Sequence, residues 1–223
     1  MIEAVIFDLD GVLIDSEQAW ASAREQLVRD RGGTWRSDAV RAMMGMSSPE
    51  WSRYMHEQLG VALAPEQIAL EVVRDLERLY RVHLPLMPGA REAVASLASR
   101  WKLGLASSAN RPIIELVLEL ADIRGLFATT VSSEEVARAK PAPDVYLEAA
   151  RRVASAPARC AAVEDSTNGL IAAHAAGMLL IALPNRDFPP IGDALGLADA
   201  VISSLGELPA ELARLAGPDE RCA

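Results

Sequence analysis

Short apolar runs alternate with helix-like segments over most of the C-terminal two thirds of the chain. Four apolar runs predict buried strands, at residues 103–106, 129–131, 160–163 and 179–183. Between them lie segments with helical patterns, at about 89–99, 112–121, 143–154 and 168–175. This alternation predicts an α/β fold in which helices cover both faces of a parallel sheet.

The N-terminal third begins with one more apolar run and then changes character. Residues 4–7 predict a buried strand, whereas residues 16–84 contain no clear strand pattern. Capping residues, prolines and glycines predict helices at about 16–31, 48–60 and 65–83. We therefore expect a core domain of residues 1–15 and 85–223, with a small helical domain of residues 16–84 inserted after the first strand. Residues 84–89 are the expected hinge.

Composition narrows the class of protein. The chain has 223 residues, of which 51% are hydrophobic, which is enough for a substantial core. Its net charge of −9 disfavours nucleic-acid binding. No stretch approaches the roughly 20 apolar residues that span a membrane, and the N-terminus lacks the basic start of a signal peptide. With Cys160 and Cys222 as its only cysteines, we expect a cytoplasmic protein without disulfides.

Two acidic residues follow the first strand. Asp8 and Asp10 are separated by one residue, so in an extended segment their side chains point to the same side. Gly11 follows and allows the chain to turn sharply. Two carboxylates held close together repel unless a cation lies between them or one keeps a proton, and either arrangement suggests chemistry. By itself, an acidic pair of this kind also fits a solvated loop.

Hydroxyl groups and a lysine mark the ends of the next two predicted strands. Ser107 ends the second strand, where a hydroxyl and free backbone N–H groups can hold a phosphate oxygen, although Ser107 and Asn110 would also suit a helix cap. Lys140 lies in the string Lys-Pro-Ala-Pro-Asp-Val-Tyr, in a chain whose only other lysine is Lys102. A lysine there would offset the negative charge of a carboxylate and a phosphate, unless it is a solvated loop residue.

Another pair of carboxylates ends the strand at 160–163. Glu164 and Asp165 are hard oxygen ligands of the kind that Mg²⁺ prefers. We expect Asp165 to bind the metal together with Asp8, and Glu164 to bind it directly or through a water molecule. Asp165 or Ser166 could also cap the following helix, and the two roles are compatible.

Four motifs at strand ends resemble, in order, those of the haloacid dehalogenase (HAD) superfamily, in its β-phosphoglucomutase-like and sugar-phosphate phosphatase branch. They are Asp8-x-Asp10-Gly11-Val12-x-x-Asp15-Ser16, the segment ending at Ser107, Lys140-Pro-x-Pro-Asp-x-Tyr, and Glu164-Asp165-Ser166-x-x-Gly169. The resemblance implies a Rossmann-like doubly wound core and a four-helix cap domain. It also implies a Mg²⁺-dependent phosphatase acting on a sugar phosphate or related small metabolite.

The resemblance assigns roles to these residues. Asp8 would be the nucleophile that forms an aspartyl-phosphate, and Asp10 the general acid/base whose carbonyl also binds the metal. Ser107 and Lys140 would hold the transferring phosphoryl group. Further substrate contacts are expected from five residues, namely Ser108, Asn110, Gly45, Met46 and Trp20. Arg41, Arg53 or Arg111 could supply one additional cation, and we expect a monomer or weak dimer.

A phosphomutase of the β-phosphoglucomutase type is the alternative. Those enzymes have a histidine where this chain has Trp20, and a lysine and an arginine around a cap glycine where it has Met44 and Ser48. These departures favour the phosphatase, although Trp20 could simply pack inside a cap helix. A metal-independent haloacid dehalogenase shares the core, but Asp10 and the Glu164–Asp165 pair favour phosphoryl transfer.

Overall fold

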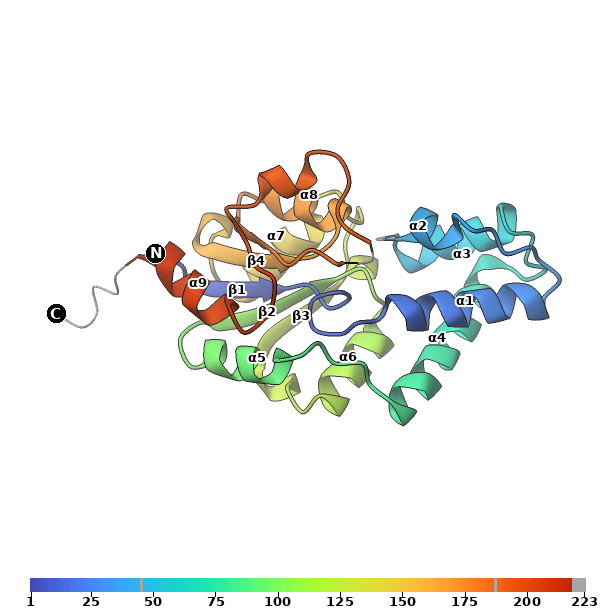
Figure 1. Cartoon of the computed structure of the whole chain (residues 1–223), viewed down its shortest axis with the longest axis horizontal. Helices are drawn as coiled ribbons and strands as arrows, with labels where there is room; N and C mark the ends of the chain where they lie inside the picture. The colour runs from blue at the N-terminus through green and yellow to red at the C-terminus, as the bar shows by residue number, and fades with distance from the viewer. Residues whose placement is uncertain (45, 187, 218–223) are drawn as a thin grey trace.

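The core of the protein is a parallel sheet with helices on both faces. The computed structural model describes residues 1–44, 46–186 and 188–217. Its sheet has the strand order β3-β2-β1-β4-β5-β6, with all pairs parallel (Figure 1). The strands are β1 (Ala4–Phe7), β2 (Lys102–Ser107), β3 (Phe127–Ser132), β4 (Cys160–Glu164), β5 (Leu179–Ala182) and β6 (Ala200–Val201). This order is that of a doubly wound Rossmann-like fold, and the predicted fold class is confirmed.

Successive side chains of the strands pack into two apolar clusters, one on each face of the sheet. Val5 and Phe7 of β1 pack on one face, and Ala4 and Ile6 pack on the other. The first face is covered by α5 (Ala90–Ala98), α6 (Arg111–Leu120) and α9 (Leu208–Ala216); the second is covered by α7 (Asp144–Arg152) and α8 (Thr167–Ala175) (Figure 1). Because both faces are buried, the strands are continuously apolar, and this is why their pattern was readable in the sequence.

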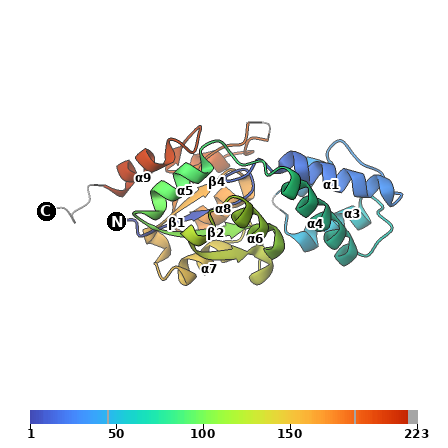
Figure 2. The same cartoon turned by 90° about the horizontal axis from the view of Figure 1, so that it is seen from below.

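The insert after β1 forms a separate helical layer beyond one end of the sheet. Figures 1 and 2 show it at the end of the molecule opposite to the N-terminus. Its helices are α1 (Glu17–Asp30), α2 (Ala39–Met43), α3 (Ser48–Glu57) and α4 (Pro65–Val82), and together they are called the helical part below. Since the strands of a parallel sheet all run the same way, this layer faces their carboxyl ends.

Most element boundaries lie within a few residues of the sequence prediction, and the exceptions have physical causes. The helix predicted from residue 48 begins where expected, with Ser47 and Glu50 forming a capping box. It ends at Glu57, before Gly60, which has a φ of +72°. The five-residue helix α2 and the two-residue strand β6 were not predicted, because elements this short carry no readable periodicity. The C-terminal helix α9 was also missed.

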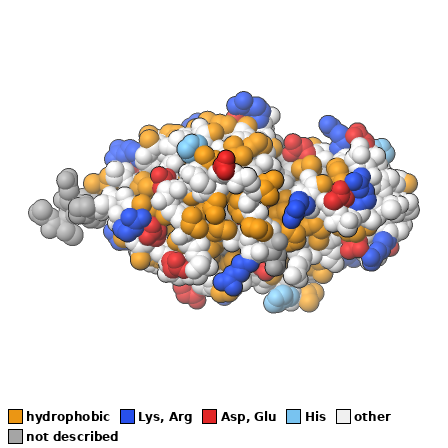
Figure 3. Space-filling model, turned by 45° about the horizontal axis from the view of Figure 1, so that its top comes forward, with side chains coloured by type: hydrophobic (Ala, Val, Ile, Leu, Met, Phe, Trp, Pro, Cys, Tyr) orange, Lys and Arg blue, Asp and Glu red, His pale blue; other side chains and the backbone are white. Residues whose placement is uncertain are grey.

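The surface carries side chains of both charges. On the face drawn in Figure 3, basic side chains are scattered among acidic and apolar ones. Within the part of the chain that the structure describes, no helix has the length and apolar character needed to cross a membrane. Cys160 is a buried free thiol on β4, whereas Cys222 lies outside the described residues.

Candidate active site

Four charged residues that the sequence analysis singled out meet at the carboxyl edge of the sheet. Asp8 directly follows β1, Glu164 is the last residue of β4, and Asp165 comes next. Lys140 reaches the same place from the segment between β3 and α7. All four side chains are buried, and they are called the sheet-edge cluster below. Neighbouring parallel strands bring them together, since their carboxyl ends share one edge.

Lys140 links two of these carboxylates. Its ammonium nitrogen lies 3.0 Å from Asp8 Oδ1 and donates a 2.6 Å hydrogen bond to Glu164 Oε1. The Tyr146 hydroxyl donates to the same Glu164 oxygen at 2.9 Å. Burial alone would lower the pKa of Lys140, but the charges of Asp8 and Glu164 outweigh it and raise that pKa above its ordinary value. Lys140 is therefore a permanent cation at the sheet edge.

The second oxygen of Glu164 is also fully engaged. It accepts hydrogen bonds from the backbone N–H groups of Asp165 and Ser166, at 2.8 and 3.0 Å, and from the Ser166 hydroxyl at 3.1 Å. Burial opposes the charge of Glu164, but Lys140 and these donors lower its pKa. A Cβ atom added to Gly169 would lie 1.7 Å from Glu164 Oε1, so glycine is required beneath this carboxylate. Through these hydrogen bonds, Glu164 connects the end of β4 to Lys140 and to the start of α8.

Asp8 and Asp165 carry charge that the protein compensates less completely. Burial raises the pKa of Asp8 to about 8, opposed by Lys140 and reinforced by Glu164 and Asp10. Burial, together with Glu164 and Asp8, raises the pKa of Asp165 well above its usual range. Asp8 Oδ1 is buried and makes no hydrogen bond of acceptable geometry, although the Lys140 ammonium is 3.0 Å away. A bound cation would offset the repulsion between these two carboxylates.

The donor set suits a divalent metal ion. Carboxylate oxygens of Asp8, Glu164 and Asp165 lie within 4.8 Å of one another. Gly11, at φ +76°, allows this approach, because a Cβ there would lie 1.9 Å from Asp165 Oδ2. Since all the donors are oxygens, the site favours a hard cation such as Mg²⁺ over zinc or copper.

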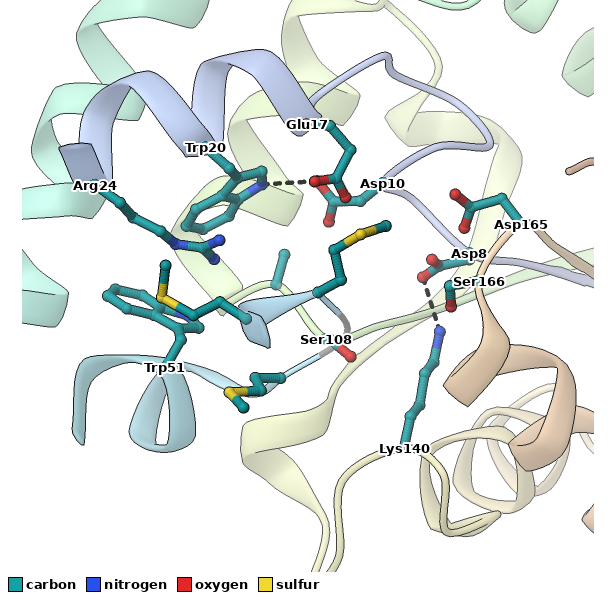
Figure 4. Close-up of a pocket in the computed structure, with 14 residues that line it drawn as sticks. Asp8, Asp10, Glu17, Trp20, Arg24, Trp51, Ser108, Lys140, Asp165 and Ser166 are labelled. Carbon is teal, nitrogen blue, oxygen red and sulfur yellow. Dashed lines mark hydrogen bonds and ion pairs between the residues drawn. The ribbon is translucent and has the colours of Figure 1, made fainter. Parts of the chain in front are cut away.

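Asp10 lies beside the cluster but is held by the helical part. Its Oδ1 accepts hydrogen bonds from the Ser16 hydroxyl at 2.5 Å and from the Trp20 indole nitrogen at 2.9 Å. Ser16 is the N-cap residue of α1, and its side chain makes no cap hydrogen bond. Figure 4 shows Asp10 turned toward α1, with Asp8 and Asp165 to its side. The two aspartates of the first motif therefore face one cavity with different partners.

That cavity lies between the sheet edge and the helical part. The core side of the cavity is lined by Asp8, Asp10, Ser108, Ala109, Lys140, Asp165 and Ser166. On the opposite side, Glu17, Trp20 and Arg24 project from α1 and Trp51 from α3 (Figure 4); these four residues are called the helical wall below. Met43, Met44 and Met46 complete the lining. Fixed charges on the core side of the cavity therefore face an aromatic surface on the opposite side.

Some predicted site residues lie elsewhere. Ser107 is fully buried and accepts a 3.0 Å hydrogen bond from the Ala109 N–H, so its neighbour Ser108 lines the cavity instead. Asn110 lines a different groove, between α3, α4 and the start of α6, and does not line the cavity. Met46 does line the cavity, while Gly45 lies outside the described residues.

The cation on the helical wall is Arg24, a residue that the sequence analysis missed. Arg41 and Arg53 line other grooves, and Arg111 forms ion pairs with Glu115 and Glu135. Glu17, Trp51 and Ser166 were likewise not predicted as lining residues. The readable signal was the spacing of Glu17, Trp20 and Arg24, which at i, i+3 and i+7 share one face of a helix.

Comparison with known proteins identifies the class of protein. The model of the haloacid dehalogenase-like hydrolase family matches residues 2–177, so the chain belongs to this family. It is 34% identical over 216 residues to hexitol phosphatase B of Escherichia coli K12, covering 94% of this chain and 96% of the relative. It is 33% identical over 179 residues to a phosphorylated carbohydrates phosphatase of Thermotoga maritima, covering 79% and 82%.

A solved structure of similar architecture holds a ligand of the expected kind. CbbY from Rhodobacter sphaeroides, in complex with phosphate, superposes with a TM-score of 0.83 at 27% identity, covering 93% of this chain and 96% of the other. The chain is thus a HAD-family phosphoric monoester hydrolase, as the motifs predicted. The dehalogenase alternative finds no support among these relatives, which are named as phosphatases.

Proposed function

We propose that this protein hydrolyses the phosphate monoester of a small sugar, polyol or related metabolite, with Mg²⁺ as its cofactor and an aspartyl-phosphate on Asp8 as intermediate. The observation that carries the proposal is the sheet-edge cluster, in which a buried lysine contacts Asp8 beside the cavity. Similarity to hexitol phosphatase B and to the phosphorylated carbohydrates phosphatase supports the substrate class.

Asp8 and Asp165 are the side chains best suited to hold the metal, together with the Asp10 carbonyl. Their carboxylates are crowded, and Asp8 Oδ1 lacks a hydrogen-bond donor. Both oxygens of Glu164 already accept protein hydrogen bonds, so Glu164 would act mainly by holding Lys140 in place. When bound, Mg²⁺ would neutralise the negative charge of the phosphate and of the attacking carboxylate.

The chain's own residues divide the remaining chemistry. An Asp8 carboxylate oxygen attacks phosphorus, and the bond from phosphorus to the ester oxygen breaks. Asp10 gives a proton to the departing alcohol oxygen, then removes a proton from the water that attacks the aspartyl-phosphate and regenerates Asp8. Lys140 balances the charge of the transferring oxygens, and Ser108, which lines the cavity, is placed to contact them.

We further propose that residues 16–84 act as a cap domain over a core of residues 1–15 and 85–223. The helical wall forms one side of the cavity, so this domain would exclude bulk water from the reaction. Trp20 favours water over a second sugar as phosphoryl acceptor, because the indole holds Asp10 and offers no ionisable group to a sugar hydroxyl.

Hydrolysis of p-nitrophenyl phosphate with and without Mg²⁺ tests the proposal. We expect activity that EDTA abolishes and Mg²⁺ restores. A panel of sugar and polyol monophosphates then defines the substrate. β-Glucose 1-phosphate is included, with separate assays for inorganic phosphate and glucose 6-phosphate. Metal-independent turnover would overturn the metal assignment, and accumulation of glucose 6-phosphate without free phosphate would overturn the choice of water as acceptor.

A further inference from the structure

Arg24 is buried in the helical wall, and this burial lowers its pKa, an effect that the nearby charges of Glu17 and Asp10 offset only in part. It is 7% exposed, and its guanidinium carbon lies 4.6 Å from the ring centre of Trp20 and 4.9 Å from that of Trp51. Among the described residues it forms no ion pair or hydrogen bond, and its Nε is buried without an acceptor. Buried charged groups in proteins are normally paired, so the missing acceptor is expected to come from a ligand.

The open side of the guanidinium faces the cavity. Figure 4 shows Arg24 pointing from α1 into the space between the two indoles and the carboxylates of Glu17 and Asp10. Both rings contact the guanidinium through cation–π interactions, and neither offers a hydrogen-bond acceptor to its N–H groups. Arg24 is therefore oriented in advance, with donors directed at whatever occupies the cavity.

Glu17 supplies the complementary group on the same helix face. It lines the same cavity and, among the residues that the structure describes, accepts no hydrogen bond and forms no ion pair with Arg24. Burial and the charge of Asp10 raise its pKa to about 7. The wall therefore presents a donor group and an acceptor group that do not satisfy one another.

Resting on the proposed function, we propose that Arg24 and Glu17 determine specificity by binding hydroxyl groups of the alcohol portion of the substrate, so that the enzyme selects a phosphate ester on a neutral polyhydroxylated chain. A hydroxyl both accepts and donates, so neighbouring hydroxyls satisfy the guanidinium and the carboxylate together. A second phosphate or a carboxylate would satisfy Arg24, but it would lie against the negative charges of Glu17 and Asp10.

Two substrates separate this role from general catalysis. Sorbitol 6-phosphate has the hydroxyl chain, whereas p-nitrophenyl phosphate has none. We expect Arg24→Met and Glu17→Gln each to lower kcat/KM for sorbitol 6-phosphate about tenfold or more, mainly through KM, and to change that for p-nitrophenyl phosphate less than about threefold. The matched control is Arg29→Met, which alters an exposed arginine of the same helix that pairs with Glu25 and should change neither value.

The possible outcomes are distinct. Parallel losses on both substrates would show that Arg24 and Glu17 serve only the structure, and would overturn the proposal. So would a wild-type enzyme that prefers fructose 1,6-bisphosphate or 2-phosphoglycolate and loses that preference in Arg24→Met. Glu17→Gln keeps the test decisive if Arg24→Met fails to fold, because it leaves the contacts of Arg24 with Trp20 and Trp51 in place.

A binding measurement separates failure of this inference from failure of the proposed function. Sorbitol 6-phosphate is titrated into the Asp8→Asn variant, with the fluorescence of Trp20 and Trp51 as the signal and Mg²⁺ present. Adding Arg24→Met should raise Kd about tenfold or more. Unchanged affinity in the folded double variant would overturn the inference, whatever the turnover assays show. An inactive wild type whose binding still depends on Arg24 would overturn only the proposed function.

Discussion

The two sides of the cavity treat charge in opposite ways. In the sheet-edge cluster, the Lys140 ammonium lies against Asp8 and Glu164, and Glu164 accepts hydrogen bonds on both oxygens. On the helical wall, Arg24 and Glu17 have no hydrogen-bond or ion-pair partner within the described chain. At the sheet edge, Lys140 and Glu164 are thus paired within the protein, while Asp8 and Asp165 remain crowded. On the helical wall, both polar groups are open to a ligand.

This difference fits a division of labour between the two parts of the protein. Phosphoryl transfer is mostly positioning and electrostatics, so its groups benefit from being fixed before the substrate arrives. Selection of the alcohol portion instead requires groups that become satisfied only when the right substrate binds. Variants in each part should therefore fail differently, and they can be ranked by the size of the effect.

Asp8→Asn should have the largest effect. It removes the proposed nucleophile, so we expect turnover of p-nitrophenyl phosphate to fall by at least about 10⁴-fold. The thermal midpoint should be unchanged or higher, because one of several crowded carboxylates loses its charge. Asp15→Asn, an exposed acid in the same motif, is the control and should keep full activity. Substantial turnover by Asp8→Asn would refute the assignment of the nucleophile.

Glu164→Gln should mainly affect stability. It leaves the buried Lys140 with one carboxylate instead of two, which should lower the free energy of unfolding by about 3 kcal/mol. Urea denaturation monitored by circular dichroism measures the loss. Glu148→Gln is the control, since Glu148 pairs with Arg151 and Arg152 at the surface and should cost less than about 1 kcal/mol. Equal losses in the two variants would contradict the structural importance of the buried pair.

Gly11→Ala and Gly32→Ala separate backbone strain from damage to the site. Both glycines have a positive φ, +76° and +73°, so alanine costs each about 1 kcal/mol of stability. Only at Gly11 does the new Cβ collide with Asp165; nothing lies within 4 Å at Gly32. We expect Gly11→Ala to raise the Mg²⁺ concentration for half-maximal activity and to lower kcat about 10²-fold. Normal metal dependence in Gly11→Ala would argue against Asp165 as a ligand.

The smallest effect on stability is expected for Glu17→Gln, and it should depend on pH. Burial raises the pKa of Glu17 from its ordinary value of 4.5 to about 7 in the folded protein. Between these values the folded state keeps a proton that the unfolded state has released, so stability falls as pH rises. Above pH 7 the variant should be more stable by about 1 kcal/mol, or roughly 2–4 °C, after allowing for solvent in the cavity.

Thermal melts at several pH values check this prediction. Below about pH 4.5 the side chain of Glu17 is protonated in both states, so the two proteins should melt together. A constant difference across the pH range would show that Glu17 is not held at a raised pKa.

The acidic residues of the sheet edge were predictable because each ends or follows a strand with a clear apolar signal, whereas Lys140 was found from its Lys-Pro-x-Pro-Asp-x-Tyr motif. Asp8 and Glu164 follow runs that are buried on both faces, and parallel strands bring such ends to one edge. Glu17 and Arg24 had no comparable signal. A charged residue on a helix is usually solvated, and periodicity reveals which residues share a face without revealing what that face meets. Asn110 lies in another groove for a related reason, since a few residues beyond a strand end the chain can turn toward either of two grooves.

The sequence by itself determined the doubly wound core, the helical insert, and the acidic and lysine residues at the strand ends, because local periodicity and short spacings encode them. Only the tertiary structure decided which oxygens Lys140 contacts, that Glu164 is already hydrogen-bonded on both oxygens, and that Arg24 is the cation on the helical wall. These are contacts between segments far apart in the chain. They depend on how the helical part packs over the sheet edge, and no local pattern of residues specifies that packing.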